Sequence, residues 1–296
     1  MPTFLIVGAA RSGTTALYYY LKQHPEVFMS KLKEPNFFAF ANEVPACSGP
    51  GSEYINNSIT KLADYHSLFE DAAGESAVGE VSPLYLYSER APARIHHYLP
   101  KARILAILRN PVEQAFSHFL YAKRQMLEPL EDFATALASE GKRKEKGWQP
   151  LFQYSQFPKY HQQLQRYFEK FPAEQIKIFL YEDLQEKPHT VLRDIFAFIG
   201  VDEDFDPDIS YRPNAGGIPR NRLLQNLVMK PFPIGKVVGR LLPEGFKRSI
   251  RDAVSDLNLQ NPPIPHTAKA LLIAELRNDI MRLQDLLDRD LSAWLQ

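Results

Sequence analysis

Cysteine is nearly absent from this sequence. The single thiol, Cys47, has no second cysteine with which to form an intramolecular disulfide, and no cluster of Cys and His has the spacing of a zinc site. A chain without disulfides fits a reducing compartment. Because Cys47 lies in a run of loop-forming residues, we interpret it as incidental and not as a catalytic thiol.

Long apolar runs and an excess of charge of one sign are also missing. No stretch of about 20 apolar residues is present, so we expect no transmembrane helix. The apolar segment 4–10 is short and no Lys or Arg precedes it, which argues against a signal peptide. The 35 basic residues balance the 35 acidic residues, so nothing draws the whole chain to nucleic acid. Any anion site must therefore be a local cluster of charge.

The chain does contain short apolar runs that alternate with helical segments. Buried strands are expected at 3–7, 103–108 and 177–180. Helices are expected at 14–23, from Pro111 behind the cap residue Asn110, at 191–199 before Gly200, and at 268–287. This alternation predicts an α/β fold in one domain spanning residues 1–296, with a central, mostly parallel sheet flanked by helices.

The composition changes from about residue 203, where we expect a helical and basic C-terminal part. The stretch 229–250 is both basic and apolar. It could act as a substrate lid, lie on a membrane surface or pack as ordinary amphipathic helices, and packing is the interpretation we favour. A second charge run, at 142–146, is expected to be a solvated loop.

An anion site is expected where the first strand meets the first helix, in the segment Gly8-Ala9-Ala10-Arg11-Ser12-Gly13-Thr14-Thr15. Backbone N–H groups at a helix N-terminus lack partners and favour negative charge, and the two glycines allow a tight turn close to a phosphate. The glycine spacing matches the loop G-x-x-x-x-G-K-[ST], but Thr14 stands where that loop has its lysine. Since this lysine meets the β- and γ-phosphates, its absence argues against ATP hydrolysis and favours a smaller anion without a required metal.

A second anion half-site is expected at Arg109 and Ser117. Arg109 directly follows the predicted strand 103–108, and the carboxyl ends of strands are where open α/β sheets bind ligands. Ser117 lies two helical turns later, so that a guanidinium and a hydroxyl can hold one phosphate together. The alternative is that Arg109 pairs with a carboxylate and Ser117 faces solvent.

Together the two motifs resemble those of sulfotransferases that use 3′-phosphoadenosine 5′-phosphosulfate (PAPS). The segment Gly8–Thr15 looks like their 5′-phosphosulfate loop, and Arg109 with Ser117 looks like their 3′-phosphate motif. Further segments resemble the family in its order, over nearly the whole chain: 33–38 (KEPNFF), 79–86 (GEVSPLYL, against the family's Gly-Glu-x-[ST]-Pro-x-Tyr), 163–172 and 290–295. The segment 33–38 is similar to the heparan-sulfate-type branch.

The resemblance implies transfer of a sulfuryl group from PAPS to a hydroxyl or amine of a saccharide, a glycolipid or a small metabolite, with PAP as the product. Arg11 would stabilise the phosphosulfate and the leaving phosphate, Ser12, Gly13, Thr14 and Thr15 would hold the 5′ end of the donor, and Arg109 with Ser117 would hold its 3′-phosphate. The family's Gly-x-x-Lys-Gly-Arg loop is not present; its nearest counterpart is 214–220, where Arg220 is the expected phosphate contact. With no membrane anchor in view, we expect a cytoplasmic, bacterial enzyme.

The resemblance also points to Glu34 as the general base for the acceptor, although an ion pair with the adjacent Lys33 is the alternative. His118 is the rival base. Adjacent helical residues point about 100° apart, so Ser117 and His118 are not expected to face one ligand. Glu80 is expected to position the acceptor or Arg11, or else to cap a helix or form a buried ion pair.

Two other classes of function stay open at this point. One is an ATP-dependent phosphotransferase, which magnesium dependence would reveal. The other is a non-catalytic nucleotide-binding protein, which would bind PAP without turnover. The joint presence of Arg11, Glu34, Arg109 and Ser117 favours the enzyme.

Overall fold

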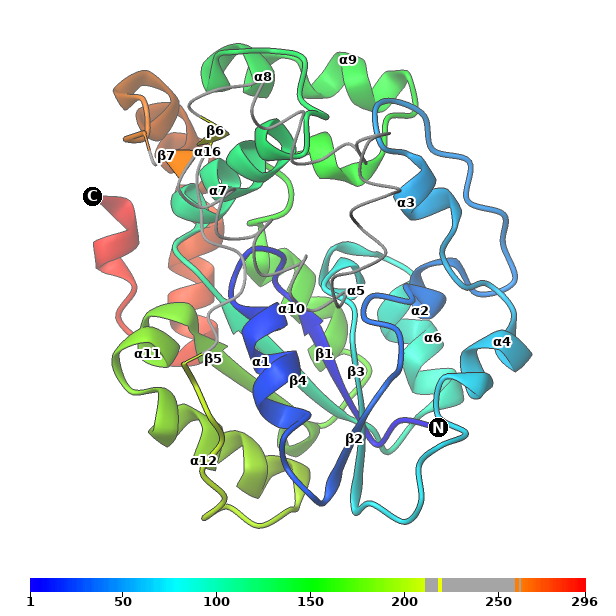
Figure 1. Ribbon diagram of the computed structural model, residues 1–296. Helices are drawn as coiled ribbons and strands as arrows, with labels where there is room; N and C mark the ends of the chain where they lie inside the picture. The colour runs from blue at the N-terminus through cyan, green and yellow to red at the C-terminus, as the bar shows by residue number, and fades with distance from the viewer. Residues whose placement is uncertain (211–217, 220–258, 261) are drawn as a thin grey trace, which may run out of the picture.

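The computed structural model describes residues 1–210, 218–219, 259–260 and 262–296. At its centre is a five-stranded sheet with the order β2-β3-β1-β4-β5, in which all neighbouring strands are parallel (Figure 1). The strands are β1 (Phe4–Gly8), β2 (Val27–Met29), β3 (Ala77–Val81), β4 (Arg103–Leu108) and β5 (Ile176–Leu180). The predicted single-domain α/β fold is confirmed, and the three predicted strands are β1, β4 and β5.

The central strands are continuous apolar runs because both faces of the sheet are covered. Along β1, Phe4 and Ile6 pack on one side with α1 (Thr14–Leu21) and α12 (Pro188–Ile199), and all three elements share one buried cluster. Leu5 and Val7 point into the other cluster. That second cluster also takes residues from α5 (Leu84–Tyr87), α6 (Ala91–Tyr98), α7 (Pro111–Arg124), α10 (Tyr160–Phe168) and α16 (His266–Leu287).

The predicted helix boundaries hold where a cap residue specifies them. Asn110 Oδ1 accepts hydrogen bonds from the backbone N–H groups of Val112 (3.0 Å) and Glu113 (3.3 Å), so that α7 begins at Pro111 as predicted. α12 ends at Gly200, whose φ of 82° is readily adopted by glycine. The predicted terminal helix is α16, which contacts α7, α8 and α10.

The other helices are short: α2 (Phe37–Phe40), α3 (Glu53–Asn56), α4 (Leu62–Ser67), α8 (Phe133–Ala138), α9 (Glu140–Glu145), α11 (Tyr181–Glu186), and the 3-10 helices η1 (Pro150–Phe152), η2 (Ala173–Gln175) and η3 (Ser292–Leu295). The prediction of a solvated loop at 142–146 is wrong for Arg143. It lies in α9 and is buried, because two nitrogens of its guanidinium donate to the two oxygens of the buried Glu128 carboxylate, at 2.7 and 2.8 Å.

Strands β6 (Ile218–Pro219) and β7 (Leu259–Gln260) form a small antiparallel pair. Arg220 and the basic stretch 229–250 lie outside the described residues, as does half of the predicted helical part from about 203. Their predicted roles stay predictions. Among the helices that the structure describes, none combines the length and the apolar character needed to span a bilayer.

Candidate active site

A cavity of about 1090 Å³ opens at the carboxyl edge of the sheet. Because all five strands are parallel, the segments that follow them meet at this one edge. Each of these segments contributes to the wall: Arg11, Gly13, Thr14 and Thr15 after β1, Lys33 and Glu34 after β2, Pro83 and Leu84 after β3, Arg109 after β4, and Tyr181 after β5.

The β1–α1 loop presents the start of α1 to the cavity. Gly13 caps the helix with a φ of 89°, and a Cβ atom at this position would lie 3.2 Å from the Tyr181 ring, so both the conformation and the contact favour glycine. Thr14 and Thr15 follow it on the cavity wall. The start of α1 thus lies on the cavity wall, as the predicted anion site requires, and the anion site itself stays a prediction.

Two residues of the predicted loop, Gly8 and Ser12, do not line the cavity. Gly8 is not on the cavity wall; a Cβ atom there would lie 2.6 Å from Leu86 Cβ, so this glycine allows β1 to pack on α5. Ser12 is fully buried, and its N–H donates to the Ala9 carbonyl at 3.3 Å. The prediction that Ser12 contacts the donor is not met, because the turn directs its side chain into the core and away from the cavity.

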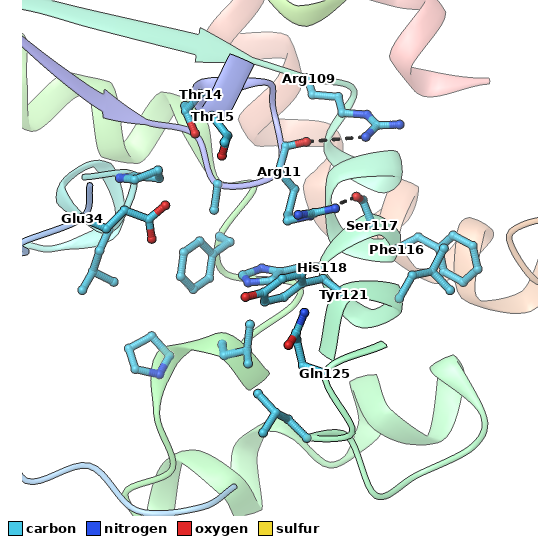
Figure 2. A pocket seen from close by; sticks show the side chains of 18 of the residues that line it. Arg11, Thr14, Thr15, Glu34, Arg109, Phe116, Ser117, His118, Tyr121 and Gln125 are labelled. Atoms are coloured by element: carbon cyan, nitrogen blue, oxygen red, sulfur yellow. Dashed lines mark hydrogen bonds between the residues drawn. The ribbon is translucent and has the colours of Figure 1, made fainter. Parts of the chain in front are cut away.

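Arg11 enters the cavity from this loop (Figure 2). Its φ of 65° is uncommon for a residue with a side chain, and such conformations cluster at functional sites. Its Nε donates to Ser117 Oγ at 3.3 Å, and its guanidinium lies 4.8 Å from the centre of the Tyr121 ring. Burial, together with the nearby cation of Arg109, lowers the pKa of Arg11 to about 10. The group is therefore still charged at neutral pH.

Arg109 and Ser117 both line the cavity, as the predicted half-site requires. Arg109 Nη1 donates to the Arg11 carbonyl at 3.5 Å, and its guanidinium lies 4.9 Å from the centre of the Tyr181 ring. One half of the alternative is also realised, since Arg109 Nη2 and Nε donate to Glu113 Oε2 at 3.0 and 3.2 Å. Because the Glu113 side chain is half exposed, an incoming anion can compete with it for Arg109.

Glu34 faces the cavity from the side opposite Arg11 and Ser117 (Figure 2). Its φ is 64°, and its N–H donates to the Val81 carbonyl at 2.9 Å. The Lys33 ammonium and the Tyr54 hydroxyl each donate to one of its carboxylate oxygens. The ion pair with Lys33 thus coexists with a position at the cavity, and each oxygen keeps a lone pair that can accept a proton.

His118 lines the same cavity as Ser117, contrary to the prediction that they would face different ligands. A wide face of α7 lines the cavity, from Phe116 to Tyr121, so residues about 100° apart both reach it. His118 is 4% exposed, and its Nδ1 has no hydrogen-bond partner among the described residues. Burial and the nearby Arg11 cation lower its pKa to about 3. A pKa so far from neutrality disfavours His118 as the general base.

Glu80 does not line the cavity, so it cannot contact an acceptor there as predicted. It is fully buried in β3, where it accepts hydrogen bonds from Ser82 Oγ at 2.6 Å and from the Tyr65 hydroxyl. The prediction fails because the side chain points from the strand into the core beneath the cavity. Its partners are hydroxyl groups, which makes it neither a helix cap nor an ordinary ion pair.

Glu80 should make the stability of the protein depend on pH. Burial raises its pKa to about 7 from an ordinary 4.5, although the hydroxyl donors lower it in part. Between these values the folded protein holds a proton that the unfolded chain has lost, so the free energy of unfolding falls as the pH rises through this window. Glu80 should lower the free energy of unfolding by about 3 kcal/mol across this window, and this loss should be absent from Glu80→Gln.

Denaturant unfolding of both proteins from pH 4.5 to 8 measures the effect. Glu140, whose pKa burial also raises to about 7, contributes the same slope to both proteins and serves as the internal reference. Identical pH dependence in wild type and Glu80→Gln would show that Glu80 titrates normally in the folded state.

Three side chains of the site were not predicted. Tyr121 follows Ser117 by four residues on α7, so helical periodicity could have identified it. Tyr181 directly follows β5, as Arg109 follows β4, so the strand-end rule could have identified it too. Tyr54 has no such signal, because its approach to Glu34 depends on how the segment carrying α3 folds across the cavity.

No group of three or more His, Cys, Asp or Glu side chains within the described ranges is arranged to hold a metal ion. The independence from metals stays a prediction, and the described part of the site includes guanidinium groups, hydroxyls, backbone amides and carboxylates.

The comparisons with known proteins all point to one protein family. Residues 1–211 match the family model described as the sulfotransferase domain. The crystal structure of a sulfotransferase from Alicyclobacillus acidocaldarius is 33% identical, with a TM-score of 0.77 and coverage of 100% of this chain and 99% of that chain.

Similar proteins of known sequence are larger. The membrane-associated sulfotransferase kil1 of Dictyostelium discoideum is 28% identical over 135 residues, which are 44% of this chain and 26% of kil1. The human bifunctional heparan sulfate N-deacetylase/N-sulfotransferase 3 is 29% identical over 208 residues, which are 68% of this chain and 22% of that protein. The matched region thus spans about a quarter of the length of these curated relatives.

Proposed function

The chain belongs to the sulfotransferase domain family, and from this premise we propose that it transfers a sulfuryl group from PAPS to a hydroxyl or amine of an acceptor. The observation that carries the proposal is the direct linkage of the two predicted anion half-sites. Arg11 joins the two half-sites, because its side chain is hydrogen-bonded to Ser117 and its carbonyl accepts a hydrogen bond from Arg109. Two cations and a hydroxyl beside a helix N-terminus suit a ligand with two separate anionic groups.

The donor would lie along this linkage. The N–H groups at the start of α1, with Thr14 and Thr15, would hold the 5′ end, and Arg109 with Ser117 would hold the 3′-phosphate. Because ATP, ADP and AMP have no 3′-phosphate, the second half-site would distinguish PAP and PAPS from them. Arg220, outside the described residues, remains a further proposed phosphate contact.

Bound PAPS would supply an activated sulfuryl group, from whose sulfur the 5′-phosphate oxygen can be displaced in line. Glu34 would accept the proton of the acceptor hydroxyl or amine as that atom bonds to sulfur. Arg11, on the other side of the cavity, would stabilise the negative charge that remains on the leaving phosphate oxygen. Positioning and neutralisation of charge suffice for this reaction, and no covalent intermediate with the protein is needed.

The acceptor would be a saccharide, a glycolipid or a small metabolite. The name of the human relative, an N-sulfotransferase of heparan sulfate, supports including amines and saccharides in a first screen. A cytoplasmic location is part of the proposal. Since kil1 is named as membrane-associated, fractionation of cells is the direct test of that location.

Thermal stabilisation by PAP tests the donor. At 100 times its dissociation constant, PAP should raise the free energy of unfolding by about 2.7 kcal/mol, whereas AMP, ADP and ATP–Mg²⁺ at equal concentration should do far less. Arg109→Ala should weaken PAP binding by about 10- to 100-fold, because a charge-assisted contact to the 3′-phosphate is lost.

The matched control is Arg193→Ala, on α12. Arg193 is 59% exposed and pairs with Glu203 and Asp204, and it is not on the cavity wall. The Arg193→Ala variant should bind PAP with the affinity of the wild type. Stabilisation by ATP–Mg²⁺ alone would refute PAPS as the donor and support the phosphotransferase alternative.

A further inference from the structure

The buried Glu80 is connected to the backbone that carries Glu34. Ser82 Oγ donates to Glu80 Oε1 at 2.6 Å and accepts from the N–H of Asn36 at 3.2 Å. The Tyr85 hydroxyl accepts from the N–H of Phe38 at 3.3 Å and is also hydrogen-bonded to Glu80. Burial and the neighbouring Glu80 carboxylate raise the pKa of Tyr85, which keeps this hydroxyl protonated. Two hydroxyls thus lie between one buried carboxylate and the segment 34–38.

The backbone conformation of the segment 34–38 needs stabilisation by its surroundings. Glu34 and Asn36 both have left-handed backbone conformations, with φ of 64° and 56°. Such a conformation is unfavourable for most residues with a side chain and persists where the surroundings impose it. Three hydrogen bonds do so here, from the N–H of Glu34 to Val81 and from those of Asn36 and Phe38 to the two hydroxyls.

Above its pKa of about 7 Glu80 is ionised, and the carboxylate then determines which way the hydroxyls point. A hydroxyl can donate or accept, whereas an ionised carboxylate only accepts. Ser82 must therefore direct its proton to Glu80, which leaves its lone pairs for the N–H of Asn36. The same logic applies to Tyr85, whose lone pairs meet the N–H of Phe38. A neutral side chain in place of Glu80 would no longer impose this polarity.

We propose that Glu80 is a positioning residue for catalysis, which acts through Ser82 and Tyr85 to aim the Glu34 carboxylate across the cavity at the reacting centre. This inference rests on the proposed role of Glu34 as the general base. It assigns a task in the reaction to a carboxylate that has no access to the substrate.

The most direct test removes the Ser82 hydroxyl, which connects Glu80 to the segment 34–38, and leaves Glu80 in place. Ser82→Ala should lower kcat by about 10- to 100-fold, the expected effect of a misplaced base, with the affinity for PAP unchanged. Ser82→Thr, which keeps a hydroxyl, should restore most of the lost kcat.

Tyr65→Phe is the matched control. It also removes a hydroxyl donor from Glu80, but that hydroxyl is not bonded to the segment 34–38, and the ring keeps its stacking on Phe37 at 4.5 Å. Measured at about pH 9, so that Glu80 stays ionised, the Tyr65→Phe variant should have a lower Tm without lowering kcat by more than about twofold. Equal losses of kcat in Tyr65→Phe and Ser82→Ala, or none in Ser82→Ala, would overturn the positioning role.

A double-mutant cycle separates this inference from the proposed function. If Glu80 acts through Glu34, Ser82→Ala should cause no further loss of kcat in the Glu34→Gln background. Normal turnover in Glu34→Gln alone would refute Glu34 as the base. A large loss in Glu34→Gln with a further, full loss on adding Ser82→Ala would refute only the positioning role.

Discussion

Glu34→Gln should reduce turnover by about 100-fold or more and leave the affinity for PAP unchanged. The substitution keeps the size of the side chain and its hydrogen bonding to Lys33 or Tyr54 but removes the group that accepts a proton. Because Glu34 faces the cavity from the side opposite Arg11 and Ser117, its loss should affect the chemical step and not donor binding. Turnover is measured with labelled PAPS on a panel of phenols, amines and saccharides, and affinity by PAP stabilisation.

Glu70→Gln provides the control for this measurement. Glu70 is exposed and not on the cavity wall, so its loss should not change turnover. Full activity of Glu34→Gln, together with a large loss in His118→Asn, would transfer the role of base to His118 despite its low pKa. In Glu34→Asp the side chain is shorter by one methylene, so its turnover should lie between those of the wild type and Glu34→Gln.

Arg11→Ala should lower turnover by about 100- to 1000-fold, the usual effect of removing one group that stabilises developing charge. The loss should exceed that of any single hydroxyl in the site, because Arg11 also holds Ser117 and packs on the Tyr121 ring. Since its pKa is about 10, the charge that it supplies should persist unchanged across the neutral range. Arg11→Lys keeps the charge but loses the planar contact, so its activity should be intermediate.

The split between kcat and KM identifies what Arg11 does. A fall in kcat at saturating PAPS would mean that the guanidinium acts mainly in the transition state. A rise in KM for PAPS with normal kcat would instead make Arg11 a binding residue that contributes equally before and during the reaction. Arg193→Ala should change neither quantity, as expected of an exposed arginine remote from the cavity.

The sequence by itself determined the elements that meet at the site. The alternation of apolar runs with helical segments predicted β1, β4 and β5 in a parallel sheet. Such a sheet requires the residues after its strands to share one edge, which brings Arg11 after β1 and Arg109 after β4 to the same side. The cap at Asn110 likewise set the start of α7 and so the position of Ser117. These features depend on local chemistry, which short stretches of sequence carry in full.

Only the tertiary structure decided where each side chain points. Ser12 turns into the core although its neighbours Arg11 and Gly13 line the cavity. Glu80 lies beneath the cavity, and Tyr54 reaches Glu34 from a distant segment. These outcomes depend on packing between residues far apart in the chain, where burial and hydrogen-bond partners are properties of the assembled core. The sequence therefore determined which edge of the sheet holds the site, while long-range packing selected which of the polar residues near that edge enter it.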